Sequence, residues 1–174
     1  VRHIKLKYGR ILQKHSKSGD REENVIEIAE AKNYGVDLIT DPNERHELAI
    51  LNLKAGEKAK VATSYPEAIR FFENGLSVLG GAKRKSDELY LRLMLELAET
   101  HYLLNDEREK GEQLFQELHS LELARQQKAE LYIKQIPLLS HSGEHAAALA
   151  LAQRGFSLLG MKTPTNPSKL GVLK

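Results

Sequence analysis

The fold of this chain is decided by residues 51–80, which read LNLKAGEKAKVATSYPEAIRFFENGLSVLG. This stretch predicts two helices joined by a short polar turn. The first helix carries a stripe of small residues: Ala55, Gly56 and Ala59. The second helix carries residues at steps of four and three, which places them on one face: Ala68, Phe72 and Gly75. Small residues let two helices approach closely, so we expect Phe72 to fill the space beside the stripe.

Two later segments repeat this arrangement of small and aromatic residues. In residues 98–118 the matching positions are Ala98, Tyr102, Gly111, Phe115 and Leu118. In residues 132–160 they are Ala148, Ala152 and Gly155. The helix ending GLSVLG of residues 75–80 returns as GFSLLG in residues 155–160. The pattern is typical of tetratricopeptide repeats, whose period is ~34 residues, although the spacing here is longer and less regular.

Composition agrees with a helical protein. Of the 174 residues, 41% are apolar and 29% charged, while aromatic residues make up 6% and Trp is absent, so Leu, Ala and Ile must supply most of the core. The four Phe side chains are expected in that core rather than in a ligand cage: Phe71, Phe72, Phe115 and Phe156. Because there is no Cys, disulfides, thiolate metal sites and Cys nucleophiles are excluded, and a cytoplasmic location is favoured.

Along the chain the pattern predicts an all-α fold, an antiparallel helix-pair solenoid of the tetratricopeptide type with about eight helices. The expected helices cover residues 1–16, 21–33, 43–62, 65–80, 87–104, 107–123, 124–139 and 144–159. Residues 36–40, VDLIT, are expected to form a packed connector or one helical turn, after which Asp41 and Pro42 begin a helix. No apolar run reaches the ~20 residues of a membrane span, and no signal peptide begins the sequence.

The first predicted helix is basic. Its apolar residues share one face, Ile4, Tyr8, Ile11 and Leu12, and the basic residues are expected on the other: Arg2, Lys5, Lys7, Arg10, Lys14 and Lys17. A solvated face, or one docked on another domain, explains such a pattern as well as contact with phosphates does. No aromatic residues are interleaved with the basic ones, and the net charge is only +2, so we expect no nucleic-acid partner.

Residues 44–80, together with the segments around LYLRLMLELAETHYLLNDEREKGEQLFQEL and AALALAQRGFSLLGMKTP, resemble the tetratricopeptide-like helical region of large bacterial multidomain signalling proteins. In that family a serine/threonine-kinase-like domain and a STAND-type ATPase of the AAA superfamily precede the helical region. GAF or PAS sensors and a histidine kinase often follow it. The resemblance implies that residues 1–42 are a helical pair after an ATPase or winged-helix part, residues 43–162 the repeats, and residues 163–174 a linker to further repeats.

The resemblance concerns the helical region only. The chain begins with Val, from which we expect a piece of a larger protein. The parent protein is expected to bind ATP and phosphorylate, whereas this piece is expected to be non-catalytic and to hold no cofactor. Residues 80–86, GGAKRKS, do not form a phosphate-binding loop, because a second Gly must come directly before Lys and Ser or Thr. They are expected to form a surface loop, with Ser86 as a phosphorylation candidate.

One short string suggests a metal site. Residues 141–145, HSGEH, match the H-x-x-E-H pattern of zinc hydrolases, whose two His must share one helix face. Here Ser142 and Gly143 fall in a predicted turn between helices, which removes that geometry. We therefore expect a polar turn and no metal.

The sequence thus predicts a scaffold that binds a protein, a peptide or another domain of its own chain through a groove lined by the first helix of each pair. The groove candidates are polar residues that the core pattern leaves free: Asn52, Lys54, Glu57, Lys60, Glu96 and Thr100. An alternative is a helical domain that senses a small effector and regulates the parent's output. A third is that the segment lends an Arg or Lys to an active site elsewhere, although no nucleophile, base and orienting group occur together.

Overall fold

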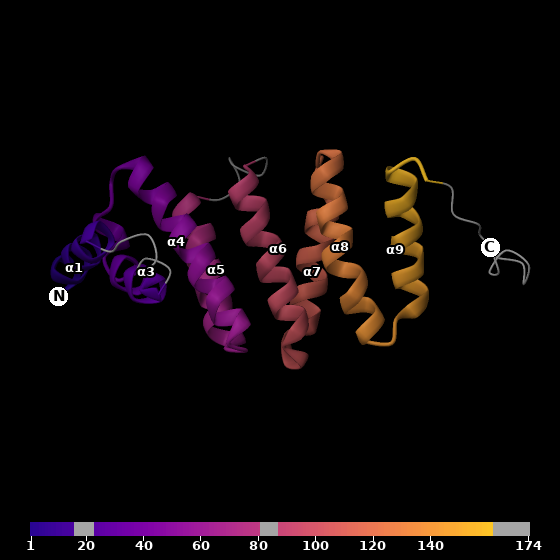
Figure 1. Cartoon of the computed structure of the whole chain (residues 1–174), viewed down its shortest axis with the longest axis horizontal. Helices are drawn as coiled ribbons and strands as arrows, with labels where there is room; N and C mark the ends of the chain where they lie inside the picture. The colour runs from indigo at the N-terminus through magenta and orange to yellow at the C-terminus, as the bar shows by residue number, and fades with distance from the viewer. Residues whose placement is uncertain (16–22, 81–86, 162–174) are drawn as a thin grey trace, which may run out of the picture. The chain divides into compact units, whose positions relative to one another are not determined.

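The computed structural model describes residues 1–15, 23–80 and 87–161. Within these ranges the chain forms eight α-helices and two short 3₁₀ helices, and no strand (Figure 1). The all-α class predicted from the sequence is therefore confirmed. The predicted break at residues 16–20, the loop at 81–86 and the linker at 163–174 lie outside the described residues.

The chain divides into two compact units, one of residues 1–121 and one that begins at residue 122. The helices of the first unit are α1 (Arg2–His15), α3 (Val25–Asn33), α4 (Pro42–Val61), α5 (Tyr65–Leu79), α6 (Glu88–Leu103) and α7 (Arg108–Ser120). Those of the second are α8 (Arg125–His141) and α9 (His145–Leu158). Two 3₁₀ helices, Val36–Leu38 and Asn105–Glu107, connect helices of the first unit. The boundary expected after residue 42 falls inside the first unit, where α3 packs against α4.

The helix boundaries have local causes that the sequence predicted. The Asp41 side chain accepts a hydrogen bond of 3.1 Å from the backbone N–H of Asn43, and Pro42 is the first residue of α4. Helix α5 ends at Gly80, whose φ of 81° lies in the left-handed region that Gly adopts without strain. The expected connector is a 3₁₀ helix followed by Ile39, which is buried.

The stripe of small residues in α4 packs against α5 as predicted. Ala55, Ala59 and Ala68 are buried, and so is Phe72. A Cβ atom added to Gly56 would lie 2.4 Å from Cε1 of Phe72. The aromatic ring therefore occupies the space that a side chain at this position would need.

The next pair of helices shows the same principle in a tighter form. A Cβ atom on Gly111 of α7 would lie 2.7 Å from the backbone nitrogen of Tyr102 and 2.8 Å from the carbonyl oxygen of Ala98. Beside this contact Tyr102 and Phe115 pack edge to face, with ring centroids 6.3 Å apart. Gly111 thus lets the backbones of α6 and α7 approach each other.

The second unit has a smaller core. Leu139, Ala148 and Leu151 are buried, and Tyr132 and Ile136 pack against them. Phe156, expected in the core, is 40% exposed. It follows Leu151 by five residues, which turns it about 140° around α9 from that buried position.

Helix α1 packs through a different face from the one its apolar pattern suggests. Its buried residues are Gly9, which lies against α3, and Leu6, which lies beside Gly35 just after α3, whereas Ile4, Tyr8 and Ile11 are exposed. The absence of a side chain at Gly9 explains why this face packs, because a Cβ on Gly9 would lie 2.8 Å from the Lys32 side chain. In residues 1–15, 23–80 and 87–161, none of the helices is both long and apolar enough to cross a membrane.

Candidate functional site: a groove between α4 and α6

A hollow of about 380 Å³ lies between α4 and the first turns of α6, and we call it the α4–α6 groove. Its apolar lining consists of Ile50, Leu53 and Leu89. Its polar and charged lining consists of His46, Lys54, Glu57, Asp87, Glu88 and Arg92. The groove therefore combines an apolar surface with charges of both signs.

Regular helix geometry places these side chains together. His46, Ile50, Lys54 and Glu57 follow one another at steps of four, four and three, so they share one face of α4. On the other side, the Asp87 side chain accepts a hydrogen bond of 3.0 Å from the backbone N–H of Leu89 and so begins α6. The opening turn of α6, with its acidic residues, is thereby fixed at the edge of the groove.

Ion pairs connect the two helices along the groove and beyond it. Arg92 of α6 donates a hydrogen bond of 2.7 Å to Glu57 of α4, and its side chain is 60% exposed. Further along, Lys60 pairs with Glu96 and, at 2.8 Å, with Glu99. An exposed pair such as Arg92–Glu57 contributes roughly 0–1 kcal/mol, so a ligand can displace it at little cost.

The six groove candidates of the sequence analysis are placed differently from one another. Lys54 and Glu57 line the α4–α6 groove. Lys60 and Glu96 form the ion pair beside it, with most of both side chains covered. Asn52 and Thr100 are fully buried and so are not free of the core.

The buried candidates have structural partners. Asn52 donates a hydrogen bond of 2.9 Å to the side-chain oxygen of Asn33 and accepts one of 2.7 Å from its nitrogen, which joins α4 to α3. Thr100 donates a hydrogen bond of 2.6 Å to the carbonyl oxygen of Glu96, one turn earlier in α6. Both side chains satisfy their polar groups within the core.

The sequence analysis missed seven lining residues: His46, Ile50, Leu53, Asp87, Glu88, Leu89 and Arg92. Those on α4 share a helix face with Lys54, so their spacing alone was a usable signal. The others, from Asp87 to Arg92, cap α6 or belong to its first two turns, and only the packing of α6 beside α4 brings them to the groove.

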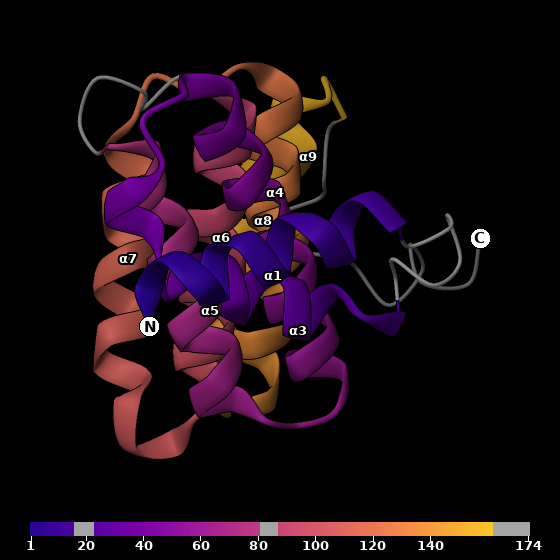
Figure 2. The ribbon, with the colours of Figure 1, turned by 90° about the vertical axis from the view of Figure 1, so that its left-hand side faces the viewer.

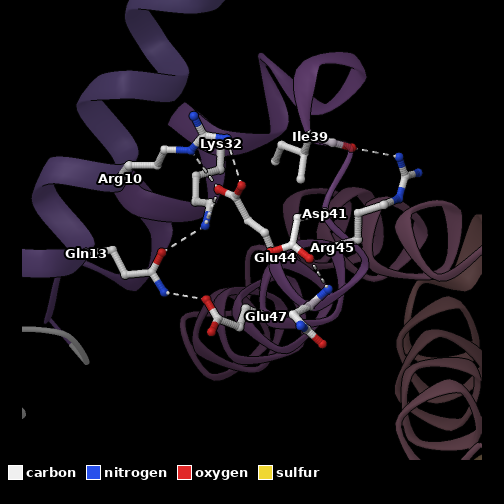
Figure 3. Close-up of polar contacts among 9 residues, drawn as sticks. Arg10, Gln13, Lys32, Ile39, Asp41, Glu44, Arg45 and Glu47 are labelled. Atoms are coloured by element: carbon white, nitrogen blue, oxygen red, sulfur yellow. Dashed lines mark hydrogen bonds and ion pairs between the residues drawn. The ribbon is translucent and has the colours of Figure 1, made fainter.

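A second polar cavity, of about 460 Å³, lies where α1, α3 and α4 meet. At its base Lys32 is 1% exposed, and its Nζ donates a hydrogen bond of 2.9 Å to Gln13 and lies 3.2 Å from Oε1 of Glu44. Arg10 donates two hydrogen bonds to the same carboxylate, of 2.8 and 2.7 Å (Figure 3). The Arg10 hydrogen bonds lower the pKa of Glu44, and the nearby Lys32 charge acts in the same direction. We call these four residues the Glu44 network; it holds three helices together.

The HSGEH string forms a turn, as expected. His141 ends α8, His145 begins α9, and Gly143 between them has a φ of 83°. The two His therefore belong to different helices. No three His, Asp or Glu side chains within the described parts of the chain are grouped as metal ligands would be.

Comparison with known proteins gives one partial similarity. The chain is 34% identical over 65 residues, 37% of its length, to hybrid signal transduction histidine kinase G of Dictyostelium discoideum. The matched stretch covers 2% of that protein. No protein-family model matches the chain, and no solved structure matches it.

Proposed function

We propose that this chain is a non-catalytic, tetratricopeptide-like scaffold that makes protein–protein or interdomain contacts within a signalling protein. The observation that carries the proposal is the α4–α6 groove, in which an apolar lining is edged by charges of both signs. Grooves of this composition suit peptides, because apolar side chains anchor the ligand while charged groups fix its orientation.

The repeat architecture is supported by how far apart in sequence the paired charges lie. Arg10 and Glu44 are separated by 34 positions, Glu57 and Arg92 by 35, and Lys60 and Glu96 by 36. These separations are close to the ~34-residue period of tetratricopeptide repeats. Contacts of this kind are expected when α1, α4 and α6 are the first helices of successive antiparallel pairs.

The close helix contacts give independent support. Gly56 meets Phe72 between α4 and α5, and Gly111 meets the backbone of Tyr102 between α6 and α7. In both cases a residue without a side chain allows consecutive helices to pack closely, as repeat units do. On this proposal α1 and α3 form a further pair of the same stack within the first unit.

The signalling assignment rests on the similarity to a hybrid signal transduction histidine kinase, of which the matched stretch covers 2%. We infer that the parent is a cytoplasmic ATP-binding kinase or ATPase and that this segment relays or organises its domains. Deleting the segment from the full-length protein should then abolish regulation while leaving nucleotide binding intact. Unchanged regulation in the deletion variant would contradict the assignment.

The groove itself is best tested by peptide selection on the intact chain. Peptides selected from a random library on the wild-type protein should lose at least about tenfold in affinity for a Lys54→Glu/Leu89→Glu variant, because one anchor surface and one charge are altered. The matched control is Ile133→Glu, a change at an exposed apolar residue of α8. If the selected peptides bind the groove variant as tightly as the control variant, the groove is not their site.

The alternative, an effector-sensing domain, draws on the size of the groove. Its volume of about 380 Å³ lies within the range of small-molecule pockets, about 300–1,000 Å³. A thermal-shift screen of metabolites would favour this function if a hit lost its effect in the same Lys54→Glu/Leu89→Glu variant. Peptide binding without any such hit would favour the scaffold.

A further inference from the structure

A stripe of apolar side chains lies on α1, apart from the α4–α6 groove. Ile4, Tyr8 and Ile11 are 71%, 44% and 48% exposed and follow one another at steps of four and three. The buried residues of α1, Leu6 and Gly9, lie on the opposite side of the helix. Figure 2 shows α1 crossing in front of α4 and α5 at one end of the first unit. We call these three exposed residues the α1 stripe.

The charges that α1 itself carries are all positive. Helix α1 contains no acidic residue. Arg2 pairs with Asp37 and Arg10 with Glu44, whereas Lys7 and Lys14 make no ion pair within the described part of the chain. Lys7 and Lys14 are seven positions apart, two helical turns, so both project along the same edge of the stripe.

The other edge of the stripe is different. The Tyr8 hydroxyl donates a hydrogen bond of 2.6 Å to the carboxylate of Glu27 on α3. A carboxylate therefore lies beside the stripe on this side, where α1 also carries the exposed Lys5. The edge formed by Lys7 and Lys14 is therefore the one on which α1 offers two cations two turns apart to a charged partner.

We propose that the α1 stripe is a docking surface for an amphipathic helix of a protein partner that carries acidic residues along one edge. Ile4 and Ile11 span about 10 Å, two turns of helix, which matches the apolar row of a short partner helix. Its Asp or Glu residues, also two turns apart, pair with Lys7 and Lys14. The surface is distinct from the groove, and the proposal does not depend on the function assigned to the groove.

Two other occupants fit this surface less well. A second copy that docked antiparallel through its own α1 would place Lys7 and Lys14 close to the same lysines of the partner copy, which is repulsive. An anionic membrane would be attracted by the lysines, but three apolar side chains bury little area in a bilayer. Pairing with an acidic helix satisfies the cationic edge and covers the stripe at once.

The test uses the whole chain and two designed peptides of about 18 residues, long enough to form a helix. Both have the same apolar face; one carries Glu and the other Lys along one edge. The wild-type chain should bind the Glu peptide about tenfold more tightly, as expected for two exposed ion pairs. Fluorescence anisotropy measures both affinities.

Charge reversal provides the decisive variant. Lys7→Glu/Lys14→Glu should reverse the preference in favour of the Lys peptide, and Ile4→Asp/Ile11→Asp should abolish binding of both. All four positions are exposed, so circular dichroism should show an unchanged fold, and Ile133→Asp/Leu149→Asp in the second unit is the matched control. The proposal is overturned if the wild type binds both peptides equally or neither, or if charge reversal leaves the preference unchanged. It is also overturned if the stripe variant instead loses self-association or binding to phosphatidylserine vesicles.

Discussion

Replacing Glu44 with Gln should destabilise the first unit more than replacing Lys32, its buried partner, with Met. Lys32 is 1% exposed, and its ammonium group lies near only two polar side chains in the Glu44 network, Gln13 and Glu44. Removing the carboxylate charge leaves a buried cation without a counter-charge. Breaking a buried ion pair in this way costs about 3–5 kcal/mol, and because the Glu44 side chain is 17% exposed we expect about 2 kcal/mol here.

Lys32→Met removes the buried charge and keeps an unbranched side chain of similar length. Glu44 then retains its two hydrogen bonds from Arg10, of 2.8 and 2.7 Å, so no charge is left unpaired. The expected cost is less than about 1 kcal/mol. In the double variant the loss of Glu44 disrupts only the contact with the half-exposed Arg10, so the two effects should combine to about 1 kcal/mol, less than their sum.

Urea unfolding followed by far-ultraviolet circular dichroism measures these differences as shifts of the midpoint at constant slope. Glu30→Gln is the control, because its pair with Arg70 is about half exposed on both sides and should cost less than about 0.5 kcal/mol. The reasoning is refuted if Lys32→Met costs as much as Glu44→Gln, or if the double variant equals the sum of the two single ones.

Three further predictions concern stability. The pKa of Glu44 is lowered in the folded state, so the unfolded state binds more protons as the solution becomes acidic. The wild type should therefore lose stability as the pH falls below the ordinary carboxyl pKa of 4.5. Urea unfolding measured at a series of pH values should show a smaller loss for Glu44→Gln. Gly111→Ala should lower the stability by about 2 kcal/mol, because the new Cβ meets the backbone of α6. Gly80→Ala has open space around it and should cost only the strain of a left-handed residue, about 1 kcal/mol. Thermal unfolding compares the two variants. Asn52→Ala should cost about 1–2 kcal/mol by leaving the Asn33 amide without its partner, and amide hydrogen exchange in α3 should accelerate. An unchanged midpoint for Asn52→Ala, or equal effects of the two Gly variants, would contradict these assignments.

The elements of this fold were predictable because their signals are local. The small-residue stripe around Gly56, the Asp41 cap and the Gly80 terminus each depend on residues within a few positions, and all three are confirmed. The helix face that packs was less predictable. In α1 the apolar pattern favoured Ile4 and Ile11, but the contact with α3 depends on the absence of a side chain at Gly9.

The polar positions depended on partners distant in sequence. Asn52 was predicted to be available for a partner because no neighbour in sequence indicates a hydrogen bond to its amide. In the structure, Asn33 on another helix forms hydrogen bonds with both its oxygen and its nitrogen. Lys32 lies in a short helix beside other small and charged residues, and no local signal distinguishes it from an exposed Lys. Burial of a polar side chain is decided by whether a partner is brought to it, which periodicity within one helix does not reveal.

A longer-range pattern would have revealed part of this arrangement. In the proposed repeat architecture, residues one period apart lie on equivalent faces of neighbouring first helices, and opposite charges there attract each other. Opposite charges separated by 34 to 36 positions occur at Arg10 and Glu44, Glu57 and Arg92, and Lys60 and Glu96. A shift of one helix by a single residue would turn each pair about 100° out of contact. These pairs therefore contribute little stability where they are exposed, but they favour one register of the helices, and that register is what places the two sides of the α4–α6 groove opposite each other.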